Sequence, residues 1–331
     1  MRDETWQQTV SGWISAAVGE PVHGLELIRT EAWSTVWRCT SREGVLWFKE
    51  NISTSPAEGA VHDVLAALAP RYVTPPVAWD RTGGWTLTRD GGTTMMDRKP
   101  EIRGIDPVEV ADMVRDYACL QRATIDHRPA LLEAGLPDGS PARAGLMLTD
   151  LAMEMAGMDP EDPRYIDQAE LQRLLGSVAG IEQASRDLLA GPVPLAFDHN
   201  DLFPRNVFVP RAGGAYHFFD FGESVWAHPF GSLVMLQWEL AHRLQVDVGD
   251  EGTLDLRHPV IGRVFDAYLE QWRDYATQPA LRTLAAAALQ IAPLYRAWVW
   301  MTVLRTTPAA LASHGGTPRA WIFDVERPVT L

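Results

Sequence analysis

The first regular pattern along the chain is a pair of short runs rich in aromatic and β-branched residues. They cover residues 33–39 and 45–49, and a polar connection over residues 40–44 separates them. Two such runs joined by a short polar connection predict a β-hairpin. Side chains of a strand return to the same face at every second residue, so Lys49 shares a face with Val45 and Trp47.

A helix is predicted directly after this hairpin. Apolar residues between 61 and 68 recur at helical spacing, and Pro70 ends the run. Residues 55–58 read Ser-Pro-Ala-Glu, which predicts an N-cap serine, a proline at N1 and Glu58 at N3, the arrangement of a capping box. A second helix is predicted around Tyr117, where residues 106–109 form a similar start signal and the apolar stripe is expected to be core.

A strand that ends in lysine and leads into a helix with an early glutamate is the order found in kinase-like lobes. There the lysine holds the α- and β-phosphates of the nucleotide, and the glutamate holds the lysine. Lys49 and Glu58 fit this order, although a capping role explains Glu58 without any lysine. Residues 30–35 contain no glycine, so phosphates would be met there by backbone N–H groups and the hydroxyls of Ser34 and Thr35.

A further short strand, residues 85–88, runs into the sequence Asp-Gly-Gly at 90–92. Glycine pairs of this kind mark turns, and this one predicts the connection between two lobes. Backbone groups near Thr88 and Asp90 are the expected place for a nucleobase edge. An ordinary hairpin end is the alternative interpretation.

The candidate chemistry lies between residues 197 and 222. Short strands at 207–209 and 215–219, joined by Pro-Arg-Ala-Gly-Gly, predict a second antiparallel hairpin. Asn206 stands just before this hairpin and Asp220 just after it, so folding brings the amide and the carboxylate side by side. Oxygen ligands at adjacent points suit Mg²⁺ that also takes phosphate oxygens and water. Asp201 precedes Asn206 by five residues, in a turn from which it can reach an incoming hydroxyl.

This segment resembles the catalytic and metal loops of the kinase superfamily, which read His-x-Asp-Leu-x-x-x-Asn and then Asp-Phe-Gly. By position, the resemblance makes Asp201 the catalytic base, Asn206 and Asp220 the metal ligands, and His199 a packing residue that holds the loop. No activation segment and no Ala-Pro-Glu follow Gly222, so the acceptor is expected to be a small molecule.

The sequence is also similar to the aminoglycoside phosphotransferase family, the choline/homoserine-kinase-like group, over roughly residues 30–235. The segments that carry this resemblance are 85–92, 117–121 and 227–230. It implies an α+β, bilobal protein-kinase-like fold. Residues 1–90 would form a small nucleotide-binding lobe with an antiparallel sheet and a helix, and residues 91–331 a mainly helical lobe with the catalytic loop, the metal loop and the substrate site. It also implies ATP or GTP as the phosphate donor and Mg²⁺ as the cofactor.

Three functions follow as hypotheses. The first is an O-phosphotransferase acting on a hydroxyl of an antibiotic, aminoglycoside-like or another natural product, with antibiotic resistance as a consequence. The second is a kinase for a primary metabolite of the sugar, choline or homoserine type. The third, of another class, is a catalytically silent nucleotide-binding scaffold, which would not be expected to keep Lys49, Asp201, Asn206 and Asp220 together.

Composition sets limits on the partners. A chain of 331 residues with 46% apolar residues predicts two packed units, and a formal charge of −14 argues against a nucleic-acid partner. That charge suits a cationic substrate or serves solubility alone. Only Cys39 and Cys119 are present, which predicts a reducing, cytoplasmic compartment without structural zinc, and the N-terminus does not read as a signal peptide. The pattern is silent on the oligomeric state.

The most apolar tract, residues 281–304, predicts a buried helical pair. Arg282, Pro293 and Arg296 interrupt it, so no membrane span is expected. Two features are candidates for acceptor recognition, each with a plainer alternative. The acidic residues 247–251 with Asp255 could meet ammonium groups or form a solvated loop. Four tryptophans could stack on a ring or belong to the core: Trp226, Trp238, Trp298 and Trp300.

Overall fold

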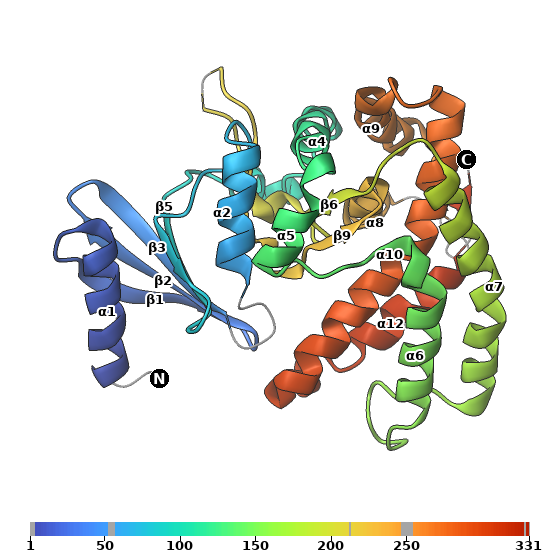
Figure 1. The fold of residues 1–331 in the computed structure, drawn as a ribbon, viewed down its shortest axis with the longest axis horizontal. Helices are drawn as coiled ribbons and strands as arrows, with labels where there is room; N and C mark the ends of the chain where they lie inside the picture. The colour runs from blue at the N-terminus through green and yellow to red at the C-terminus, as the bar shows by residue number, and fades with distance from the viewer. Residues whose placement is uncertain (1–3, 52–56, 212, 246–253, 328, 331) are drawn as a thin grey trace.

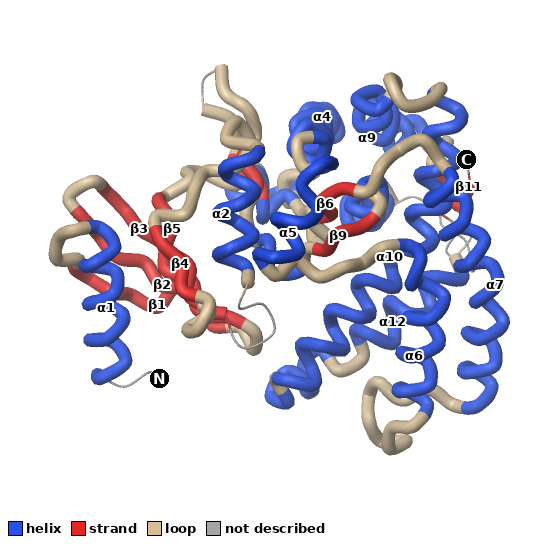
Figure 2. Tube along the Cα trace, in the orientation of Figure 1, coloured by secondary structure: helices blue, strands red, loops and turns tan. Residues whose placement is uncertain are grey.

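The computed structural model describes residues 4–51, 57–211, 213–245, 254–327 and 329–330, and it has two lobes (Figure 1). The small lobe contains a five-stranded sheet with helices α1 (Glu4–Val18) and α2 (Glu58–Leu68) beside it. The remaining chain is mainly helical, and its few strands are short (Figure 2). The predicted α+β, bilobal architecture is confirmed.

The sheet of the small lobe is antiparallel throughout, in the order β1-β2-β3-β5-β4. Its strands are β1 (His23–Thr30), β2 (Ser34–Ser41), β3 (Gly44–Asn51), β4 (Ala78–Asp80) and β5 (Trp85–Arg89). The predicted first hairpin is confirmed as β2 and β3, and the strand predicted at 85–88 is β5.

The turn of this hairpin is tighter than the predicted connection over residues 40–44. Ser41 pairs with Gly44, which places Val36 opposite Lys49 along the ladder. A connection over residues 40–44 would instead have placed Thr35 opposite Lys49. Because a slip of one residue moves every side chain to the other face, this difference decides what faces the nucleotide side of the sheet.

The two faces of the sheet have different tasks. One face packs on α1 through a small core of Val10, Ile14, Trp37 and Phe48, each no more than 4% exposed. Lys49 follows Phe48 and therefore points to the opposite face, toward α2.

Helix α2 confirms the predicted helix but begins differently. The first helical residue is Glu58, and the N-cap Ala57 makes no side-chain capping bond. Ser55 and Pro56 of the predicted capping box lie outside the described residues. Glu58 therefore stands at the first helical position and not at N3, which leaves its carboxylate free for another partner.

The large lobe packs around one continuous core. The helix predicted around Tyr117 is confirmed as α4, with Asp106 as its N-cap. The helices of this lobe are α3 (Met95–Arg98), α4 (Pro107–Arg122), α5 (Arg128–Ala134), α6 (Ala144–Ala156), α7 (Gln168–Ala190), α8 (Val234–Arg243), α9 (Pro259–Leu269), α10 (Gln278–Thr306), α11 (Leu311–His314) and α12 (Thr317–Phe323). Its strands are β6 (Ala196–Asp198), β7 (Val207–Phe208), β8 (His217–Phe218), β9 (Val225–Ala227), β10 (Leu254–Asp255) and β11 (Val329–Thr330).

The predicted helical pair over residues 281–304 is wrong, because these residues belong to the single helix α10 of 29 residues. Pro293 lies inside it, and a proline there costs about 3 kcal/mol. Burial on several sides, against α6, α7 and α12, offsets that cost. No helix within the described ranges is long and apolar enough to cross a membrane. The acidic residues 247–251 lie outside the described residues, and Asp255 belongs to β10, which pairs with β11.

Candidate active site

The second predicted hairpin is confirmed as β7 and β8, where Val207 pairs with Phe218. Beyond the last strand pair, the Phe219 N–H donates to the Asn206 carbonyl at 3.2 Å. This bond holds the two ends of the hairpin together, so Asn206 and the residue after Phe219, Asp220, stand at the same edge.

Asp201 is held by its own loop. Its Oδ2 accepts from Asn206 Nδ2 at 2.8 Å and from an Arg205 guanidinium nitrogen at 2.8 Å. Asn206 Nδ2 also donates to the Asp201 carbonyl at 2.9 Å. The other carboxylate oxygen, Oδ1, is buried and has no hydrogen bond within the described residues. A buried acceptor without a donor is costly, so this oxygen is suited to receive a hydroxyl from a ligand.

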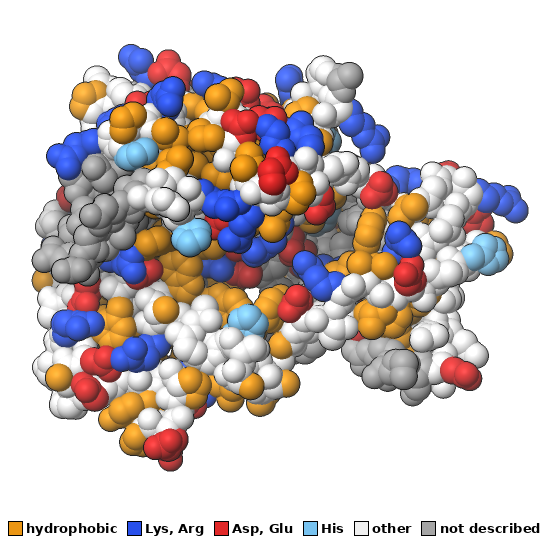
Figure 3. All heavy atoms as spheres, turned by 180° about the vertical axis from the view of Figure 1, so that it is seen from behind, with side chains coloured by type: hydrophobic (Ala, Val, Ile, Leu, Met, Phe, Trp, Pro, Cys, Tyr) orange, Lys and Arg blue, Asp and Glu red, His pale blue; other side chains and the backbone are white. Residues whose placement is uncertain are grey.

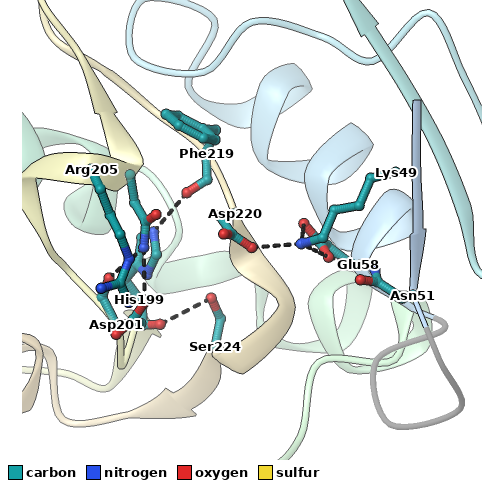
Figure 4. Close-up of polar contacts among 10 residues, drawn as sticks. Lys49, Asn51, Glu58, His199, Asp201, Arg205, Phe219, Asp220 and Ser224 are labelled. Carbon is teal, nitrogen blue, oxygen red and sulfur yellow. Dashed lines mark hydrogen bonds and ion pairs between the residues drawn. The ribbon is translucent and has the colours of Figure 1, made fainter. Parts of the chain in front are cut away.

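His199 ties the Asp201 loop to the segment that carries Asp220. Its Nε2 lies 3.0 Å from the Phe219 carbonyl oxygen (Figure 4). Its ring centroid lies 5.4 Å from that of Phe221. Burial lowers the pKa of His199, so the imidazole is neutral. The structure thus places His199 where the resemblance expects a packing residue.

Asp198 also stabilises the loop that carries Asp201. Its Oδ1 accepts from Ser232 Oγ at 2.5 Å and from the Asn200 N–H at 2.7 Å. Burial raises the pKa of Asp198 to about 7, although these two hydrogen bonds oppose the rise. Asn200 has a left-handed backbone (φ 59°), and so has Asp220 (φ 65°). Two of the four non-glycine residues with positive φ in the described chain thus lie here, as is common at functional sites.

Lys49 lies between two carboxylates from different elements. Its Nζ lies 2.8 Å from Glu58 Oε2 and 2.6 Å from Asp220 Oδ1 (Figure 4). The question left open for Glu58 is therefore answered in favour of the ion pair with Lys49. Burial alone would lower the pKa of Lys49, but Asp220 and Glu58 outweigh it and raise that pKa. Burial would likewise raise the pKa of Asp220, but Lys49 holds it at about 2, so Asp220 is an anion.

The donor set of Asn206 and Asp220 fits Mg²⁺. Mg²⁺ keeps several waters and takes phosphate oxygens, so it needs only one or two protein ligands. An ionised carboxylate and an amide at the same hairpin edge meet this need. Within the described residues, no group of three or more His, Cys, Asp or Glu side chains could hold a metal ion. A metal at Asn206 and Asp220 would therefore need phosphate oxygens and water as its further ligands.

Two cavities meet at these residues. One, of about 370 Å³, lies under the sheet and is lined by Val36, Thr88, Asn206 and Phe208 among others. The other, of about 470 Å³, is lined by Asp201 and by side chains of α10. Both are lined by Arg29, Lys49, Arg205 and Asp220. In the space-filling view, Lys, Arg, Asp and Glu side chains gather around the hollow between the two lobes (Figure 3).

The hydroxyl of Thr35 faces away from these cavities, which corrects its expected contact with phosphate. Thr35 Oγ1 accepts from the indole N–H of Trp37 at 3.3 Å and donates to Glu50 at 3.5 Å, both on the α1 side of the sheet. The tight turn described above is the reason. Ser34 lies on the Lys49 side, where it is 1% exposed and its hydroxyl has no partner among the described residues.

The end of β5 borders the first cavity, where the sequence predicts a nucleobase edge. Thr88 and Asp90 both line this cavity. The Asp90 N–H, however, donates to the Val45 carbonyl at 3.2 Å, and the Asp90 carboxylate accepts from the Trp47 indole at 2.9 Å. The N–H of Asp90 is thus already used by the sheet. Gly91 is required here, since a Cβ would lie 2.2 Å from the Phe208 ring.

Two residues of the site were missed at the sequence level, Arg296 and Glu223. Arg296 comes from α10 and is 4% exposed. Its Nη1 donates to the Asn200 carbonyl at 2.9 Å and to the Glu223 carboxylate, and lies 3.4 Å from Asp201 Oδ1. Burial raises the pKa of Glu223 to about 7, against the effect of Arg296. An arginine inside the apolar run 281–304 was the signal that could have found this contact.

Comparison with known proteins supports the fold assignment. No family model matches the sequence, and no curated protein is similar to it in sequence. Among solved structures, a macrolide 2'-phosphotransferase type I is 13% identical with a TM-score of 0.58, over 94% of this chain and 97% of that one. The GDP and kanamycin complex of APH(2")-IIia is 12% identical with a TM-score of 0.60, over 96% and 98%. An ethanolamine kinase from Plasmodium vivax is 10% identical with a TM-score of 0.59, over 91% and 84%. The chain shares the protein-kinase-like fold of these proteins over nearly its whole length.

Proposed function

We propose that this chain is a small-molecule kinase that transfers the γ-phosphate of ATP or GTP to a hydroxyl group, with Asp201 as the catalytic base. The observation that carries the proposal is the Asp201 carboxylate. One of its oxygens is held by Asn206 and Arg205. The other is buried at the cavity, accepts no hydrogen bond from the described residues, and has Arg296 Nη1 as an ion-pair partner at 3.4 Å.

The other residues take roles that follow from their positions. Lys49, at the meeting point of both cavities, binds the nucleotide phosphates, and Glu58 orients it. Asn206 and Asp220 would hold Mg²⁺, which supplies positive charge to the transferring phosphate. Ser34 lies at the start of β2 on the nucleotide side, and Thr88 lines the nucleotide cavity. We assign residues 1–90 to the nucleotide-binding lobe and residues 91–331 to the catalytic and acceptor lobe.

The chemistry requires little of the base. Phosphoryl transfer proceeds mainly by positioning and by stabilising charge on the phosphate oxygens. Asp201 orients the acceptor hydroxyl and takes its proton as the oxygen–phosphorus bond forms. Arg205, 2.8 Å from Asp201 and shared by both cavities, can contact the transferred phosphate from the same side.

We propose an antibiotic or other natural product as the acceptor, because a macrolide and an aminoglycoside phosphotransferase share the fold. A primary-metabolite kinase is the second candidate, since the ethanolamine kinase shares the fold equally well.

The test is a nucleotide-consumption screen with Mg²⁺ against hydroxyl-bearing antibiotics, amino alcohols and sugars, with Asp201→Ala as the control. The proposal expects at least one acceptor that is phosphorylated on oxygen by the wild-type chain and not by the variant. Transfer that persists in Asp201→Ala would remove Asp201 from its role as base. Mg²⁺–nucleotide binding without transfer to any acceptor would favour the scaffold hypothesis.

A further inference from the structure

The cavity beside Asp201 has an aromatic wall that is built from both lobes. Trp33, in the connection between β1 and β2, lies 5.2 Å from Trp300 of α10 and 5.2 Å from His314 at the end of α11, between ring centroids. Trp300 and His314 are stacked on each other at 5.0 Å. All three rings line the cavity, as does Trp298.

This cluster is a cavity wall and not part of a filled core. The Trp33 and His314 side chains are only partly buried. The cavity they line, about 470 Å³, has the size of sites that hold small organic ligands. Trp33 also stands in the glycine-free connection, where its ring packs on the large lobe. Trp33 therefore lines the acceptor side of the cleft.

The charge of the cavity is balanced, unlike that of the chain, which carries −14. Its described lining contains four acidic and four basic side chains other than histidine. Three acidic side chains have a basic partner within the lining: Asp201 with Arg205, Asp220 with Lys49, and Glu223 with Arg296. Only Glu31, the fourth, makes no ion pair with another described residue. A polycation would need several uncommitted carboxylates, and this cavity offers one.

From these two observations we infer the class of acceptor, an inference that rests on the proposed function. The acceptor is a hydroxyl-bearing compound with an apolar or aromatic ring that packs on the wall of Trp33, Trp300 and His314, and it carries at most one positive charge. The acidic balance of the whole chain then serves solubility and does not attract a polycationic substrate.

The test measures direct binding by calorimetry, without nucleotide, with three probes: phenyl β-glucoside, methyl β-glucoside and the polycation kanamycin. The two glucosides share the sugar and differ only in the group on the anomeric oxygen, which is a phenyl ring in one and a methyl group in the other. We expect phenyl β-glucoside to bind about tenfold more tightly than methyl β-glucoside, from burial of the phenyl ring, and more tightly than kanamycin.

Variants then locate the ring. Trp33→Ala should weaken phenyl β-glucoside binding about tenfold and Trp33→Phe should restore most of it, because an aromatic surface remains. Trp79→Ala is the matched control, since Trp79 lies on β4, is 39% exposed and does not line the cavity. Trp300→Leu, which removes a second ring of the wall, replaces this variant if Trp33→Ala fails to fold.

The inference is overturned if kanamycin binds more tightly than phenyl β-glucoside, if neither glucoside binds, or if Trp33→Ala and Trp79→Ala behave alike. Mg²⁺–ATP binding, measured in parallel, separates this result from the proposed function. Glucoside binding without Mg²⁺–ATP binding would refute the kinase and keep the ring site. Mg²⁺–ATP binding with no preference for the phenyl ring would refute the ring site and leave the proposed kinase function intact.

Discussion

Replacing Arg296 by methionine tests the contact that joins α10 to the Asp201 loop. Methionine keeps an unbranched apolar chain at the position but removes the guanidinium. Glu223 then loses its cation, the Asn200 carbonyl loses a donor, and Asp201 keeps only Arg205 as a charged partner. The change is confined to one buried group in the middle of a long helix.

The expected cost follows from burial. Removing one partner of a buried ion pair costs about 3–5 kcal/mol, because the remaining charge is left without compensation. The Arg296 and Asp201 side chains are 5% and 6% exposed, but the Glu223 side chain is 25% exposed and is partly solvated. We therefore expect the lower end, a loss of about 3 kcal/mol in the free energy of unfolding at pH 8. The loss should be smaller at pH 6, where Glu223, with a pKa of about 7 even beside Arg296, takes up a proton.

The assay is urea unfolding followed by circular dichroism, with Arg282→Met as the matched control. Arg282 lies on the same helix and pairs with Asp266, but their side chains are 26% and 43% exposed, so its loss should cost no more than about 1 kcal/mol. Glu223→Gln in the Arg296→Met background should recover part of the stability. The reasoning is refuted if Arg296→Met costs less than about 1 kcal/mol at pH 8, or no more than Arg282→Met.

Three further predictions address the remaining groups of the site. Asp201→Asn should slow transfer to any acceptor by about 10²–10⁴-fold while Mg²⁺–nucleotide affinity, measured by calorimetry, stays unchanged; an equal loss of affinity would contradict its place at the acceptor cavity. Lys49→Met should raise the dissociation constant of the nucleotide about 10–100-fold, the value of one charge-assisted hydrogen bond, whereas Lys99→Met, which removes a surface pair with Asp106, should not. Asp198, with a pKa of about 7 when folded and about 3.9 when unfolded, binds its proton more tightly in the folded state. Asp198 should therefore contribute a fall in stability between pH 4 and pH 7 on the order of 4 kcal/mol, and Asp198→Asn should remove that part of the slope in urea titrations while the part due to Glu223 remains. Parallel slopes for the two proteins would show that Asp198 is not the group responsible.

Local pattern determined much of this protein. Both hairpins follow from short strands and polar turns, and α4 follows from its cap and apolar stripe, because strand and helix periodicities are properties of neighbouring residues. The pairing of Asn206 with Asp220 belongs to the same class, since a hairpin brings the residues at its two ends together wherever it lies in the fold.

The register of the β2–β3 hairpin could not be predicted from local pattern to within one residue. The composition of residues 40–44 does not say which two residues form the turn. The tight turn at Ser41 and Gly44 moved Thr35 to the α1 face and left Val36 opposite Lys49. The choice depends on which face the core of α1 covers, and this is a property of the packed lobe.

Only the tertiary structure brought Arg296 to Asp201 and Trp33 to Trp300. These pairs are separated by 95 and 267 residues, and no local rule selects which side of a buried 29-residue helix faces a distant loop. Pro293 predicted a break, yet burial against α6, α7 and α12 keeps α10 continuous. Long-range burial, summed over many side chains, outweighs a local preference of about 3 kcal/mol, and it thereby sets the surroundings of the candidate base.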